Sequence, residues 1–146
     1  MNHWTKRIGT FLLQVACTTL LMLGIHILMN GMFLLGIPKS DTVQKVVLSY
    51  PEKTSVSKEF TDRESIEHAV GLTNFLHYVP FAQADISEEP LVTITYYTDD
   101  SDPVSISANR NTVWWKGKAY KLKQEGFFIN LTEGIFYLEE SVTGSH

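Results

Sequence analysis

Residues 8–37 form an unbroken run without a formally charged side chain, preceded by Lys6 and Arg7 and closed by Pro38. The hydrocarbon core of a bilayer is about 30 Å thick, and roughly 20 apolar helical residues cross it. The run is therefore long enough to span a membrane. It constrains the chain more than any other feature, because everything after Pro38 must then lie on one side of that membrane.

Three interpretations compete for this run: a cleaved signal peptide, a lipoprotein signal and an uncleaved anchor. A cleavable signal has an apolar core of about 7–15 residues and a small-residue cleavage site. Here the run is far longer, and no Ala-x-Ala pattern follows it. Cys17 follows Ala16 as in a lipoprotein, but Gln14 occupies a position that is usually aliphatic, and the chain stays apolar long after Cys17. We therefore expect an uncleaved membrane anchor.

The charges that flank the run predict its orientation. Lys6 and Arg7 lie before it, whereas Lys39 after it is offset by Asp41. Positively charged flanks stay on the cytoplasmic side. We expect a cytoplasmic amino terminus and an extracytoplasmic carboxyl-terminal domain at the cell membrane.

A helix over the whole run would be about 45 Å long, which exceeds what the hydrocarbon needs. It must tilt, project beyond the bilayer, or loosen near Gly31 and Gly36. Within it, Thr19, His26 and Asn30 fall in an arc of about 40° at roughly 3.6 residues per turn. Such a polar stripe predicts contact with a membrane protein partner or a second copy of the chain. Alternatively, threonine bonds its own backbone, and the residues near the outer end reach the headgroups.

Composition bounds the remainder of the chain. After residue 37 there are ten Lys or Arg against sixteen Asp or Glu, a net charge of −6. Nucleic acid requires a basic surface, so a nucleic-acid partner is not expected. The only cysteine, Cys17, lies inside the apolar run, which leaves the domain without a disulfide.

Hydrophobic periodicity predicts an α+β domain made of two strands, one helix and an antiparallel β-meander. Thr61-Asp62-Arg63-Glu64 matches a capping box, and apolar residues then recur at helical spacing until a helix end before Pro80. From residue 91 onward the period is two. Lys116-Gly117-Lys118 predicts a hairpin loop in which glycine adopts positive φ. Strands are expected at 43–50, 54–60, 91–98, 104–108, 112–115 and 119–123, with further elements at 127–131 and 135–138.

Residues 43–122 resemble a known group of domains in their order of elements. They include VQKVVLSYPEKTSVSKEFTDRESIEHAVGLTNFL, LVTITYYTDDSDPVSISANRNTVWWKGKAYKL and an aromatic–Lys–Gly–Lys–x–Tyr turn at 115–120. The pattern resembles small secreted or membrane-anchored domains of unknown function from Firmicutes. The resemblance implies a bacterial α+β fold outside the cytoplasm and implies no particular activity.

No catalytic constellation is apparent in the sequence. His68 and His77 lie nine residues apart, on opposite sides of one helix, so they cannot share a metal ion from that helix alone. Asp99, Asp100 and Asp102 lack the remainder of a calcium loop and are typical of a solvated turn. We expect no enzyme and no cofactor, although a buried His68 beside an acid would revive an enzymatic hypothesis.

One hairpin carries the only basic aromatic patch on this acidic domain: Trp114, Trp115, Lys116, Lys118, Tyr120 and Lys121. Such a patch suits anionic lipid headgroups, cell-wall polymer or a protein partner. Alternation also allows a simpler interpretation, in which one tryptophan lies in the core and the lysines protect an edge strand.

The sequence thus predicts an anchored, non-enzymatic interaction or regulatory module, with a small-ligand or cell-wall-polymer binding module as the alternative. The expected division is a cytoplasmic terminus at 1–7, an anchor at 8–37, a linker at 38–42, the domain at 43–140 and a disordered tail at 141–146.

Overall fold

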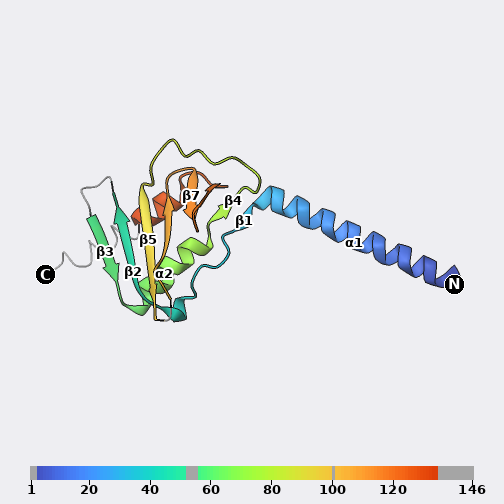
Figure 1. Ribbon diagram of the computed structural model, residues 1–146, viewed down its shortest axis with the longest axis horizontal. Helices are drawn as coiled ribbons and strands as arrows, with labels where there is room; N and C mark the ends of the chain where they lie inside the picture. Colours follow the sequence, from blue (N-terminus) through green and yellow to red (C-terminus); the bar gives the residue numbers. More distant parts are fainter. Residues whose placement is uncertain (1–2, 52–55, 100, 135–146) are drawn as a thin grey trace.

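The computed structural model describes residues 3–51, 56–99 and 101–134. A long amino-terminal helix, α1 (His3–Asn30), extends away from an α+β domain (Figure 1), which confirms the predicted fold class. By length and composition, Trp4–Asn30 fits a membrane span or a signal sequence, and its apolar window is not buried in the domain as a core helix would be.

The domain is built on one antiparallel sheet of six strands. The inward-facing residues of β2 are Val46, Leu48 and Tyr50, each at most 4% exposed, in the alternation that the sequence predicts. In sheet order, the strands are β3 (Val56–Phe60), β2 (Val43–Tyr50), β5 (Val92–Thr98), β6 (Val104–Ala108), β7 (Thr112–Trp115) and β8 (Lys118–Lys121).

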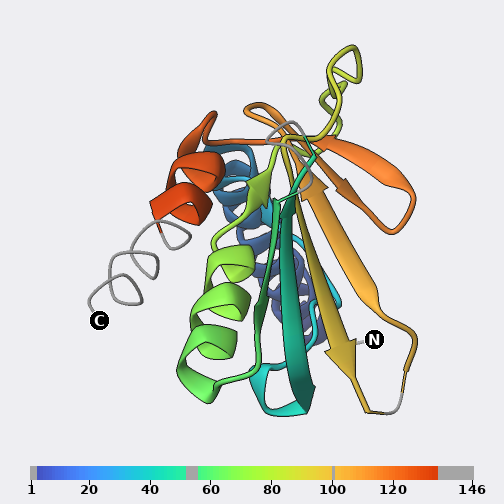
Figure 2. The same cartoon turned by 90° about the vertical axis from the view of Figure 1, so that its left-hand side faces the viewer.

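Two helices cover the same face of this sheet (Figure 2): α2 (Arg63–Asn74) and a helix that occupies 127–134. The core lies between them and the sheet. Its polar link is Tyr96, whose hydroxyl donates to the Ala69 carbonyl and contacts the Thr73 hydroxyl, both at 3.0 Å. Burial raises the pKa of Tyr96 far above its usual value, so this link stays protonated.

The start of α2 differs by one residue from the predicted capping box. Asp62, not Thr61, is the N-cap, and its side chain accepts a hydrogen bond of 2.8 Å from the Ser65 backbone N–H. Both residue types cap helices well. Ser65 and Ile66, in the first turn that follows the cap, are both buried.

Residues 127–134 form a helix, whereas the sequence left the type of this element open. Phe128, Ile129 and Thr132 are all buried, at the i, i+1, i+4 spacing of a helix face. The predicted element at 135–138 and the predicted tail lie outside the described residues.

The most consequential difference concerns the end of α1. The helix ends at Asn30, and Gly31 follows with a φ of 78°, a left-handed position at a helix carboxyl terminus. Of the three alternatives for an overlong helix, the chain therefore adopts loosening at Gly31. The next residues form β1 (Met32–Phe33), which pairs antiparallel with β4 (His77–Tyr78).

Residues 34–37 belong to the domain rather than to the helix. Leu34 is buried in the core, and Ile37 packs against it. A short 3-10 helix, η1 (Ser40–Thr42), then leads directly into β2. The predicted helix to residue 37 is thus wrong, because Leu34 and Ile37 cover apolar core surface that would otherwise meet water.

Strand β4 also bonds the far edge of the large sheet. The Val79 N–H donates to the Lys121 carbonyl at 2.8 Å, and the Lys123 N–H donates to the His77 carbonyl at 2.9 Å. Backbone hydrogen bonds therefore run without interruption from β1 through β4 to β8. The end of α1 is tied to the sheet by secondary structure.

Replacing Gly31 tests this junction. A Cβ on Gly31 would lie 2.7 Å from the Tyr78 carbonyl oxygen, and its positive φ is strained for any L side chain. We expect Gly31→Ala to destabilise the domain by about 2 kcal/mol, measured by urea unfolding of the full chain in detergent. Gly24→Ala is the matched control, because nothing lies within 4 Å of an added Cβ there. Equal stability of the two variants would contradict the tied junction.

The Asp62 cap predicts a dependence of stability on pH. The hydrogen bond from the Ser65 backbone N–H lowers the pKa of Asp62 below its ordinary 3.8. The ionised cap therefore stabilises the fold above that pH, and this stabilisation is lost as pH falls through the lowered pKa. Asp62→Asn should keep the cap, and its free energy of unfolding should fall less at acid pH than that of the wild type. Asp62→Ala should cost about 1 kcal/mol at neutral pH. If urea titrations gave the same decrease in unfolding free energy at acid pH for the wild type and Asp62→Asn, the assignment would be contradicted.

Candidate functional site

A pocket of about 260 Å³ opens where α1 leaves the domain. Its walls come from the segment after β1, from β4 and from the β7–β8 hairpin. The lining residues are aliphatic, aromatic and basic: Leu34, Leu35, Tyr78, Trp115, Lys116, Lys118 and Tyr120. Four of the six residues that the sequence grouped in the hairpin patch therefore meet in this pocket.

Aromatic rings form one side of the pocket. Trp115 is only 4% exposed, and its Nε1–H donates to the Leu35 carbonyl oxygen at 3.0 Å. The rings of Tyr78 and Tyr120 lie 4.7 Å apart between centroids, tilted by 48°. Because its single polar hydrogen already binds the segment after β1, Trp115 holds the pocket together. It is the core tryptophan that alternation allowed.

The hairpin loop places one lysine over the pocket. Lys116 and Gly117 have φ of 48° and 75°, the paired positive values of a two-residue type I′ turn. Lys116 Nζ lies 5.2 Å from the Trp115 ring centroid, within range of a cation–π interaction. It also occupies the space that a side chain on Gly36 would need. The ammonium is therefore folded back toward the pocket.

A second lysine completes the positive charge. Lys118 stands directly opposite Trp115 in the β7–β8 ladder, so both side chains project to the same side. Within the described part of the chain, no carboxylate lines the pocket or lies within ion-pair distance of Lys116 or Lys118. The site is thus locally cationic on an acidic domain.

The structure does not bring Trp114 and Lys121 into this site. Trp114 stands opposite Ser107 and Ala119, and Lys121 stands opposite Thr112, on the other side of the hairpin. Successive strand residues alternate in direction, so the predicted patch divides between the two faces of the sheet.

Exposed apolar side chains border the same end of the domain. Phe33 is 57% exposed and Leu35 is 75% exposed, and both follow α1 by a few residues. Phe81, three residues after β4, is fully exposed and has a φ of 63°. The sequence did not single out any of the three, because Phe33 and Leu35 belong to the apolar run expected to be helical and Phe81 lies in no predicted element.

The polar residues of α1 find partners inside the helix. The Thr19 hydroxyl donates to the Val15 carbonyl at 2.9 Å. Asn30 Nδ2 donates to the Nδ1 and to the carbonyl oxygen of His26, both at 3.1 Å. These donors need no partner helix, and association through Thr19, His26 and Asn30 stays a prediction.

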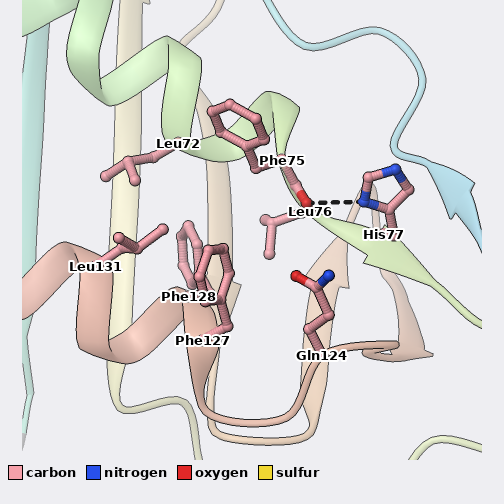
Figure 3. A pocket seen from close by; sticks show the side chains of 8 residues that line it. All are labelled: Leu72, Phe75, Leu76, His77, Gln124, Phe127, Phe128 and Leu131. Atoms are coloured by element: carbon pink, nitrogen blue, oxygen red, sulfur yellow. Dashed lines mark hydrogen bonds between the residues drawn. The ribbon is translucent and has the colours of Figure 1, made fainter. Parts of the chain in front are cut away.

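A second pocket lies between the end of α2 and the helix at 127–134 (Figure 3). Leu72, Phe128 and Leu131 make it apolar, and the His77 ring beside it donates from Nδ1 to the Phe75 carbonyl at 2.9 Å. Its volume of about 10 Å³ is at the lower limit for one water molecule. This crevice is a small gap in the packing between the two helices.

The titratable residues do not gather into a reaction centre in the residues that the structure describes. His68 is exposed on α2, so it is not the buried histidine that an enzymatic hypothesis required. No three His, Cys, Asp or Glu side chains of this part of the chain are close enough to hold a metal ion. Asp99 accepts a hydrogen bond from Gln44 at 2.5 Å, as a surface turn residue does.

Comparison of the chain with protein-family models, with curated proteins and with solved structures finds no match.

Replacing the pocket tryptophan tests its structural role. Trp115→Phe removes the hydrogen bond to Leu35 and part of a buried ring, so we expect a loss of about 1–3 kcal/mol. Amide exchange over 34–37 should also rise. Trp114→Phe makes the same change on the open face and should cost less than about 1 kcal/mol in the same urea titration. Similar losses in both variants would contradict the assignment.

Proposed function

We propose that this chain is a single-pass membrane protein whose extracytoplasmic domain is a non-enzymatic interaction or regulatory module. Its binding face is the pocket beside α1, with Lys116, Lys118 and Tyr120 as contact residues. Lys6 and Arg7 before the apolar helix support a cytoplasmic amino terminus, and the acidic domain then lies outside.

The observation that carries this proposal is the direct junction between α1 and the domain. Gly31 turns the chain out of the helix, and β1 pairs at once with β4. Over residues 30–34, all of which the structure describes, no flexible segment separates the helix from the pocket. A binding face held in this way keeps a constant height above the membrane, which suits recognition of something that is itself in or on that membrane.

A binding pocket for a small ligand or for cell-wall polymer is the second candidate. The volume of about 260 Å³ approaches the lower range of ligand sites, and the half-buried aromatic ring of Tyr120 suits the flat face of a sugar. A thermal-shift screen of the full chain against wall fragments would detect such binding, and no shift with any fragment would exclude it.

Site-specific crosslinking in membranes tests the leading proposal. A photo-crosslinking amino acid at Lys118 should form adducts with another membrane component, because this side chain is exposed at the pocket. The matched control places it at Lys58 on β3, the opposite edge of the sheet.

The adducts at Lys118 should disappear when Lys116 is also changed to Gln, and the yield at Lys58 should not change. Recovery of only the uncrosslinked chain from both positions would overturn the proposed role, as would equal adducts from both.

A further inference from the structure

We propose that the pocket beside α1 binds the phosphate headgroups of anionic phospholipids in the bilayer that α1 crosses. The base of the domain then rests on the membrane surface. This inference rests on the proposed function, because it names the partner of the same binding face.

The length of α1 places the pocket at the level of the headgroups. From Ile8, just after the last charged residue of the amino terminus, to Asn30 the helix is roughly 35 Å long. The hydrocarbon core takes about 30 Å of this length. Asn30 therefore lies at the outer boundary of the hydrocarbon, and β1 starts two residues later. Leu34 and Leu35, which line the pocket, are within reach of the headgroup layer.

The apolar rim suits contact with lipid. Phe33, Leu35 and Phe81 are exposed, and each lies in or within three residues of β1 or β4, the strands that lie beside the end of α1 (Figure 1). Single exposed apolar residues are ordinary. Phe81 differs, because a bulky residue with a φ of 63° is a backbone outlier, and such strain persists chiefly where function requires it. Aromatic side chains are enriched at membrane interfaces.

The charge distribution selects anionic lipid. Lys116 and Lys118 face the pocket with no carboxylate of the described residues beside them. The chain beyond residue 37 carries a net charge of −6, so most of the domain is repelled by an anionic surface. The pocket is an exception, and the domain is thereby oriented with this end toward the membrane. Each lysine near such a surface strengthens attraction about fivefold.

Amide exchange of the full chain in nanodiscs tests this inference. We expect the amides of 79–82 and 116–120 to exchange several-fold more slowly in discs containing one third phosphatidylglycerol than in discs of phosphatidylcholine alone. Salt of about 1 M should remove the difference, because the Debye length falls to about 3 Å. Inorganic phosphate added to the neutral discs should give no protection.

Matched variants separate local recognition from net charge. Lys116→Gln with Lys118→Gln should weaken docking on the order of 25-fold and abolish the difference between the two lipids. Lys45→Gln with Lys58→Gln makes the same change of charge on β2 and β3, which are remote from the pocket in the sheet order. This double variant should keep the difference in exchange between the two lipids. Phe81→Ser should reduce protection without altering the fold, because its side chain is fully exposed.

Equal exchange in both lipids, or equal loss of protection in the two double variants, would overturn lipid docking. Protection that appears only when membrane proteins are added would overturn it in favour of a protein partner. Adducts at Lys118 that persist while lipid protection is absent would leave the interaction role standing and remove this inference alone.

Discussion

The architecture depends on how the chain leaves its long apolar helix. At Gly31 the backbone adopts a φ of 78° and passes so close to the Tyr78 carbonyl that no side chain fits. This close approach lets β1 pair with β4, and β4 in turn bonds the chain at 121–123 beside β8. An unsatisfied backbone group at a helix end is costly when buried. Here the groups that follow the helix are satisfied by the domain itself, so the helix and the sheet form one hydrogen-bonded structure.

The pocket is a consequence of this junction. The chain after β1 crosses the β7–β8 hairpin, where the Leu35 carbonyl accepts from Trp115 and Gly36 leaves room for Lys116. The same residues therefore attach the segment to the sheet and shape the pocket. This explains why Trp115, an aromatic residue that looks like a contact residue in the sequence, is buried, whereas Lys116 and Lys118 beside it stay exposed.

Much of the sheet is predictable from the sequence, because each face of a strand meets a constant environment. β2, β6 and β7 have the predicted bounds, and the apolar face of α2 is the predicted one. The two-residue strands β1 and β4 carry no periodic signal, and residues 32–37 continue an apolar run that is typical of a helix. Only Gly31 and Gly36 hinted at a break. The hairpin residues of the site were foreseen, whereas Leu34, Leu35 and Tyr78 join them only through the long-range pairing of β1 with β4.

The junction also limits what kind of regulation such a domain can perform. A domain on a flexible linker can reach targets at different distances, and its effective concentration at a target falls as the linker lengthens. This domain has no such linker between Asn30 and β1, so it cannot reach outward. If the helix tilts, the ladder through β4 carries the tilt to β8 and to Lys118. Under the proposed function, the angle of the helix would therefore set how the pocket faces its partner.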